Sequence, residues 1–210
     1  MSRLTLYLNI NTHLLQDSKP SIFMESVFSD PLFMEYPYNM LYELKSAEQH
    51  PKHHPEGNVW NHTMLVIDEA AKAKSQSKYP TVFMWAALLH DISKPACFTV
   101  DVNGRGHFYG HHTKSAEESE KILRRLGYDD KFINEVKILI QYHYIKEIVS
   151  NVKEKGIKKF IDSVGEERLD DMLELIQADM MGKPNTDNIE VVQKLRDLSK
   201  EYLNYKDEKK

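Results

Sequence analysis

The chain has 210 residues, of which 41% are hydrophobic and 29% charged, a balance that is ordinary for a globular protein of one domain. Its formal net charge of −4 disfavours nonspecific binding to nucleic acid or to an anionic membrane surface. The single cysteine, Cys97, excludes an internal disulfide, and the N-terminal residues do not resemble a secretory leader, so we expect a cytoplasmic protein. No apolar run approaches the ~20 residues that a membrane-spanning helix needs, so we expect no membrane partner.

Prolines interrupt the first part of the chain. Pro20, Pro31 and Pro37 predict an irregular N-terminal extension over residues 1–37, with a short helix around 22–28, and we expect it to pack on the core. Downstream, apolar residues recur with the spacing of helices. Helices are predicted, in chain order, over 38–48, 59–75, 80–90, 112–126, 129–143, 153–163, 166–181 and 187–205.

Turn and cap residues mark several boundaries between these helices. Asn58 is a candidate N-cap for the helix over 59–75, and Gly127 is well placed to end the helix before it. The dipeptide Asn103-Gly104 predicts the turn of a small β-hairpin near residues 98–109. The predicted fold is therefore all-α with one small hairpin, ending in a charged, fraying tail after the last helix.

An apolar helix runs directly into a charged pair. Residues 81–89 (TVFMWAALL) are apolar on every helical face, which is typical of a buried helix, and His90 and Asp91 follow at once. Burying an unpaired carboxylate is costly, so buried charges are normally paired or bound to metal. A partner for the carboxylate of Asp91 is therefore expected inside the protein.

Three more polar side chains fall on apolar helix faces. His143 and Asp179 each complete a series of apolar residues at i, i+3, i+4 and i+7, and His62 shares a face with Leu65 and Val66. Taken alone, each histidine is more simply explained as a hydrogen-bonded core residue. Together with the charged pair they favour one shared divalent metal, because separate core hydrogen bonds would need several coincidences. Imidazole and carboxylate ligands suit Fe, Mn, Co, Ni or Zn, and Mg less well.

Five segments then resemble the HD superfamily of metal-dependent phosphohydrolases. HDISKP at 90–95 is similar to the HDIGKP-type motif of that family. The other segments, with the family features that they resemble, are HPEGNVWNHT at 54–63 (first metal histidine), FYGHH at 108–112 (F-x-G-H), YHY at 142–144 (later histidine) and QADMMGKP at 177–184 (closing aspartate).

The resemblance covers roughly residues 38–185, which we interpret as an HD-domain helical bundle, followed by a C-terminal helix and charged tail over 186–210. It is greatest to the HD domain attached to some bacterial CCA-adding tRNA nucleotidyltransferases. We expect the domain to stand alone here, without their synthesis activity.

The resemblance implies a metal site with one or two ions. The resemblance implies that one ion is bound by four side chains: His62, His90, Asp91 and Asp179. A second ion is implied if His111 and His143 also reach the site, with Asp91 bridging both ions and acting as a catalytic residue. The implied ligands are His62, His90, Asp91, His111, His143 and Asp179.

Other polar residues are candidates for catalysis or substrate binding. Lys94 could neutralise charge on a substrate phosphate or simply form a structural ion pair, and His111 or His112 could give a proton to the leaving group. His112 is also a candidate extra ligand or a solvated helix residue. His54 and Glu56 could line the mouth of the pocket or merely form a turn. We expect Lys94, His112 and His54 to bind substrate.

The function implied is cleavage of a phosphomonoester or phosphodiester by a metal-activated hydroxide. The expected partner is a small, nucleotide-like phosphorylated substrate, with 2′,3′-cyclic nucleotides a first guess, and a homodimer is left open. The alternatives are a di-iron oxygenase on the same scaffold and a noncatalytic, metal-containing module that binds a ligand.

Overall fold

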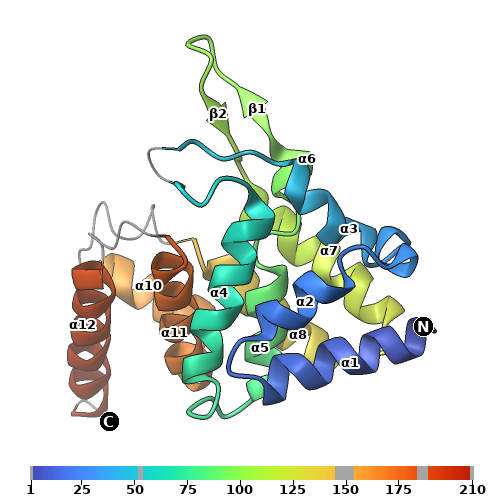
Figure 1. The fold of residues 1–210 in the computed structure, drawn as a ribbon. Coiled ribbons are helices and arrows are strands. Elements are labelled where there is room, and N and C mark those ends of the chain that lie inside the picture. The colour runs from blue at the N-terminus through green and yellow to red at the C-terminus, as the bar shows by residue number, and fades with distance from the viewer. Residues whose placement is uncertain (1, 52–53, 145–153, 184–188, 209–210) are drawn as a thin grey trace.

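The structure is a computed structural model that describes residues 2–51, 54–144, 154–183 and 189–208. Within these ranges the chain forms α-helices, short 3-10 helices and one two-stranded antiparallel sheet (Figure 1). The prediction of an all-α fold with one small hairpin is confirmed. No helix in the described ranges is long and apolar enough to cross a membrane.

The elements follow one another as a series of short helices. The first part of the chain contains α1 (Arg3–Gln16), α2 (Pro20–Val27), the 3-10 helix η1 (Pro31–Met34), α3 (Asn39–Glu43), η2 (Leu44–Ser46), α4 (Val59–Ala73), α5 (Pro80–Leu89) and α6 (Lys94–Cys97). The second part contains β1 (Thr99–Val100), β2 (Gly106–His107), α7 (His111–Arg125), α8 (Asp130–Tyr142), α10 (Glu154–Val164), η3 (Glu166–Arg168), α11 (Leu169–Met181) and α12 (Ile189–Asp207).

The prediction of an irregular extension over residues 1–37 is wrong. Pro20 and Pro31 open α2 and η1 instead of breaking them, because the first position of a helix needs no backbone N–H. Ahead of them, α1 is capped by Ser2 and buries Leu6, Ile10 and Leu14 at intervals of four residues. These helices pack on the rest of the protein, α1 against α5 and α2 against α4 (Figure 1). The division of the chain at residues 37 and 185 stays a prediction.

Two other boundaries differ from the prediction. The helix expected over 38–48 is divided into α3 and η2, and the helix expected from 166 begins as η3 before α11 starts at Leu169. The C-terminal tail is also more ordered than expected, since α12 continues to Asp207. Lys206 in its last turn forms an ion pair with Glu166. This ion pair connects the last turn of α12 to η3.

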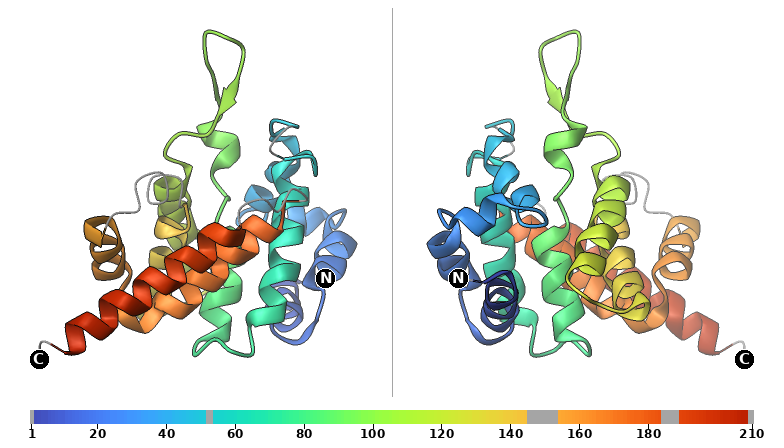
Figure 2. Two further views of the ribbon diagram at one scale, coloured as in Figure 1. Left: turned by 90° about the vertical axis from the view of Figure 1, so that its left-hand side faces the viewer. Right: turned by 90° about the vertical axis from the view of Figure 1, so that its right-hand side faces the viewer.

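The centre of the core is α5. All residues from Val82 to Leu89 are buried, as expected for a helix that is apolar on every face. Helices α1, α4, α8 and α11 all contact it. Figure 2 shows these helices gathered into one body, with the hairpin projecting from it. The residues that follow α5 are therefore delivered into the middle of the protein.

The hairpin forms where it was predicted. Strand β1 pairs with β2 in antiparallel register, with Thr99 opposite His107. Gly104 has a φ of 75° in the connecting turn, a left-handed conformation that glycine adopts easily. The carboxylate of Asp101 accepts hydrogen bonds from the backbone N–H groups of Asn103 and Arg105, which closes the turn. The hairpin stands out from the helical body between α6 and α7 (Figure 1).

Candidate metal centre

Five helical segments bring the six predicted ligands together. His62 lies in the first turns of α4, His111 begins α7, Asp179 lies near the end of α11, and His90 and His143 follow the last residues of α5 and α8. Asp91 comes next to His90 in the turn that links α5 to α6. Five of the six are at most 5% exposed, and the Asp179 side chain is 15% exposed.

The side chains of four of these residues, His62, His90, Asp91 and Asp179, direct ligand atoms toward one another. Nε2 of His62 lies 2.9 Å from Oδ1 of Asp179 and 3.8 Å from Oδ2 of Asp91. Nε2 of His90 lies 3.1 Å from Oδ2 of Asp91 and 4.0 Å from Oδ1 of Asp179. Ligand atoms that are each bonded about 2.1 Å from one ion lie roughly 3 to 4 Å apart. The group therefore fits a single divalent ion.

The second oxygen of Asp91 faces the remaining two histidines. Its Oδ1 lies 3.3 Å from Nε2 of His111 and 3.8 Å from Nε2 of His143. Oδ1 of Asp91 and Nε2 of His90 are buried without a hydrogen-bond partner in the described structure. Buried polar atoms left without partners are costly, so these two atoms point to an ion that would satisfy them.

Backbone carbonyls fix the orientation of three imidazole rings. Nδ1 of His90 donates to the carbonyl oxygen of Ala87 at 2.8 Å, and Nδ1 of His111 donates to that of Phe108 at 2.8 Å. Nδ1 of His143 makes the same bond to Ile140 at 2.6 Å. With the ring proton held at Nδ1, the lone pair of Nε2 points toward the carboxylates. This arrangement is the one that histidine ligands of metals adopt.

The charge states also suit a divalent ion. Burial lowers the pKa of the His111 ring, and burial together with His90 lowers the pKa of His143 to about 3, so both are neutral near pH 7. For both carboxylates burial acts to raise the pKa, but nearby lysines and histidines hold it well below its usual range. His90 differs, because burial is more than offset by Asp91 and its pKa is raised. Binding of an ion to His90 therefore competes with protonation of its ring.

Lys94 lies deep beside Asp91. Its Nζ is 2.6 Å from Oδ2 of Asp91 and donates a hydrogen bond to Oε1 of Gln49 at 2.9 Å. The side chain is only 9% exposed. Of the two alternatives for Lys94, the structural ion pair is present, and a role toward phosphate stays a prediction.

The two histidines expected to bind substrate flank the ligands. The His112 ring contacts His111 edge-on at 5.6 Å between ring centres and stacks on Tyr144 at 5.7 Å. The His54 ring contacts that of His62 at 5.3 Å. Both are partly buried, and their function stays a prediction.

Glu56 and Lys183 also lie at the site; the sequence left the contribution of Glu56 open and did not indicate Lys183. The Glu56 carboxylate is 3% exposed, and its Oε1 lies 2.7 Å from Nδ1 of His54 and 3.1 Å from Nδ1 of His62. Burial acts to raise the pKa of Glu56, but these two histidines lower it to about 2. Lys183 lies beside Asp179, with Nζ 3.1 Å from Oδ1. Lys183 lies four residues after Asp179 but beyond the last residue of α11, so helical spacing alone did not indicate it.

Glu56 contacts Nδ1 of the candidate ligand His62, on the side of the ring away from the metal site. A carboxylate behind a metal-bound imidazole fixes the ring and makes it a better donor, and losing such a group typically lowers metal affinity 10- to 100-fold. We expect Glu56→Gln to weaken Mn²⁺ binding by about tenfold, as measured by titration of the chelator-treated protein. Glu69→Gln, which removes a partly buried carboxylate of α4 that pairs with the exposed Lys72, is the matched control and should leave the affinity unchanged. Equal affinities for both variants would contradict the assignment.

Comparison with known proteins places this arrangement in a family. The family model described as "HD domain" matches residues 59–197. The chain belongs to the HD domain family. All six predicted ligands lie inside the matched range, whereas His54 and Glu56 lie just before it. The predicted family is confirmed.

Several curated relatives share this HD domain. A multifunctional CCA protein of Actinobacillus pleuropneumoniae is 27% identical over 176 residues, which cover 82% of this chain and 40% of the relative. A multifunctional CCA protein of Aromatoleum aromaticum is 31% identical, covering 67% of this chain and 34% of the relative. An A-adding tRNA nucleotidyltransferase of Deinococcus radiodurans is 32% identical over 45% of this chain and 21% of its own length. The chain spans less than half the length of these relatives.

Proposed function

We propose that this HD domain is a metal-dependent phosphohydrolase that cleaves a phosphoester of a small, nucleotide-like substrate. The observation that carries the proposal is the position of the Asp91 carboxylate. Its two oxygens face two different sets of imidazole nitrogens. A shared carboxylate between two ligand sets is suited to a pair of ions. A divalent ion, when bound, supplies an activated water near neutral pH and polarises a phosphoryl oxygen.

The residues around the ligands would bind and orient the phosphate. Lys94 carries a positive charge beside Asp91, and its ammonium donates to Gln49 from a nearly buried position. A phosphate oxygen that displaces one of these contacts would gain a charge-assisted hydrogen bond in a site with little water. Lys94 would then neutralise charge that builds up on the phosphate during cleavage.

His112 is better suited than His111 to protonate the leaving group. His111 has its Nδ1 bonded to Phe108 and its Nε2 directed at Asp91, which suits a ligand and leaves no free nitrogen for proton transfer. His112 keeps Nδ1 buried without a hydrogen-bond partner in the described structure. Its ring stands next to that of His111 at the edge of the cluster. We therefore assign proton transfer to His112 and metal binding to His111.

The relatives support a nucleotide-like substrate. One of them is named as an A-adding tRNA nucleotidyltransferase, a protein that handles a nucleotide and a tRNA. The net charge of −4 makes a long polyanion an unfavourable partner for this chain, so a small phosphorylated molecule fits better. Cyclic 2′,3′-nucleotides and nucleoside monophosphates are the first compounds to test.

The experiment compares the chelator-treated protein with samples reloaded separately with Mn, Fe, Co, Ni, Zn and Mg. Elemental analysis gives the ions per chain, and phosphate release or ester opening is followed with cyclic nucleotides, nucleoside monophosphates and a chromogenic phosphodiester. We expect one or two ions per chain and hydrolysis that disappears on chelation and returns with at least one metal.

Two results would contradict the proposal. Equal hydrolysis with and without chelator would exclude the metal from the chemistry. Tight iron binding with oxygen consumption and no hydrolysis of any ester would favour the di-iron oxygenase instead.

A further inference from the structure

Each of the two carboxylates in the candidate metal centre forms an ion pair with a lysine. Nζ of Lys94 lies 2.6 Å from Oδ2 of Asp91, and Nζ of Lys183 lies 3.1 Å from Oδ1 of Asp179. These two oxygens are the same atoms that face Nε2 of His62 and His90. Two ammonium groups therefore contact the oxygens that an ion would use.

The end of α11 and Gly182 position Lys183 beside Asp179. Lys183 follows α11 after one residue, Gly182. Its backbone N–H donates to the carbonyl oxygen of Met180. A Cβ on Gly182 would lie 2.7 Å from Cγ2 of Val66, so only glycine lets the end of α11 approach α4 this closely. Lys183 thus lies beside Asp179, and its side chain, which is 26% exposed, is more exposed than that of Asp179 at 15%.

Lys183 also lies near the other charged groups of the site. The negative charges of Asp91 and Glu56 act on its ammonium group in addition to that of Asp179, and its positive charge acts on His54. Lys94 acts on His54 as well. His54 is thus within electrostatic range of both lysines, and burial lowers the pKa of its ring. The two lysine ammonium groups supply the positive charge that an anion bound beside the ligands would need.

An ion on Asp179 changes what Lys183 can do. A divalent cation and an ammonium group on the same carboxylate oxygen repel each other, and the repulsion is strong where little water screens it. Lysine has a flexible stem of four carbons, so its ammonium can leave this oxygen without any movement of the backbone. Its charge is then free for an anion bound next to the ion.

We propose that Lys183 neutralises Asp179 when no ion is bound and binds a phosphate oxygen of the substrate once an ion occupies that carboxylate. The ligand class, a phosphate group, rests on the proposed function. Lys183 and Lys94 then contact the phosphate from opposite carboxylates, with His54 beside them. Lys183 becomes a substrate-binding residue in addition to those predicted from the sequence.

Two binding measurements test the proposal without turnover. Mn²⁺ is titrated into the chelator-treated protein, and inorganic phosphate is titrated into the Mn²⁺-loaded protein. In Lys183→Met we expect Mn²⁺ to bind as tightly as in the wild type or more tightly, because a competing cation is gone. Phosphate should bind about tenfold more weakly, or worse, since a charged hydrogen bond is lost. Lys183→Arg should bind phosphate within a few-fold of the wild type.

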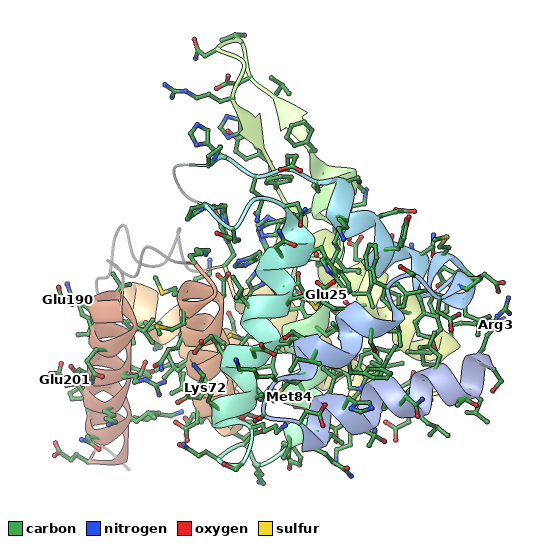
Figure 3. All side chains as sticks on the ribbon, viewed as in Figure 1. Arg3, Glu25, Lys72, Met84, Glu190 and Glu201 are labelled. Carbon is green, nitrogen blue, oxygen red and sulfur yellow. The ribbon has the colours of Figure 1, made fainter. Side chains whose placement is uncertain are left out.

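Lys72→Met is the matched control. Lys72 also pairs with a carboxylate one helical turn away, Glu69 at 2.7 Å, but it is exposed and lies at the far end of α4 from the hairpin (Figure 3). This variant should change neither measurement. Lys183→Gln is the second test variant, and circular dichroism shows which variants are folded.

Two outcomes would overturn the proposal. Weaker Mn²⁺ binding with unchanged phosphate binding in Lys183→Met and Lys183→Gln would make Lys183 a structural support for Asp179. Failure of the Mn²⁺-loaded wild-type protein to bind inorganic phosphate would remove the ligand itself. If phosphate binding depends on Lys183 but no ester is hydrolysed, this inference stands and the proposed hydrolase activity fails.

Discussion

Replacing Asp91 with alanine is expected to remove both the bound metal and the hydrolytic activity. Its two oxygens face separate sets of imidazole nitrogens at 3.1 and 3.3 Å, so the substitution removes a ligand from both sets at once. Metal-ion catalysis is worth several kcal/mol, and the expected loss of activity is on the order of a thousandfold or more. Elemental analysis and the hydrolysis assay measure the two effects on one sample.

Two further variants separate this loss from a general effect on folding. Asp91→Asn keeps the size of the side chain and should lose metal and activity as well, while Lys94 loses its charged partner. Asp130→Asn removes a largely exposed carboxylate that pairs with Arg124 and should behave as the wild type. Full metal content together with full activity in either Asp91 variant would refute the central role of this residue.

Replacing Trp60 with alanine is expected to lower the free energy of unfolding by about 3 to 5 kcal/mol. Trp60 is fully buried, its Nε1 donates to Oε1 of Glu25 at 2.6 Å, and its ring packs on Phe28 and Phe33 at 4.7 and 5.8 Å between ring centres. The substitution leaves a cavity and removes the partner of a carboxylate. The expected loss is a large part of the 5 to 15 kcal/mol that stabilises a typical domain.

Urea denaturation followed by circular dichroism measures this effect. Trp60→Phe is the companion variant, because it keeps a ring in the cavity and loses mainly the hydrogen bond to Glu25, so a smaller change is expected. Figure 3 shows Glu25 on α2 beside α4. A change below about 1 kcal/mol in Trp60→Ala would mean that α2 and η1 contribute little to the stability of the core.

Helical spacing predicted the burial of the site residues well. His143 follows three apolar residues at the spacing of one helix face, and it is 2% exposed in the structure. His62 is fully buried as predicted, although Leu65, which was assigned to the same apolar face, is 41% exposed. The burial of His90 was predicted from the apolar run that precedes it, and His90 is also fully buried. His111 could not be found this way, because it is the first residue of its helix and has no preceding turn to set a period. Only its resemblance to a family motif indicated it.

Other features depended on contacts that one sequence does not reveal. His62 and Asp179 are 117 positions apart, and which carboxylate oxygen faces which ring follows only from how α4 packs on α11. Lys183 was missed because its place depends on the close approach of Gly182 to Val66. Helix α1 was missed because residues 1–37 were interpreted as irregular. Helix α2 was predicted only as a short helix around 22–28, because Pro20 was interpreted as a breaker rather than as its first residue.

Hydrogen bonds to backbone carbonyl groups orient three imidazole rings of the site independently of a bound ion. His90, His111 and His143 each donate to the residue three positions earlier, so local backbone geometry orients every one of these rings. Orienting them therefore costs no further conformational entropy when an ion binds. The core around α5 is made of apolar side chains rather than metal ligands, unlike that of a zinc finger, which is unfolded until its metal binds. We therefore expect the protein to fold without an ion, so that the choice of metal follows from ligand chemistry and from which ions are available in the cell.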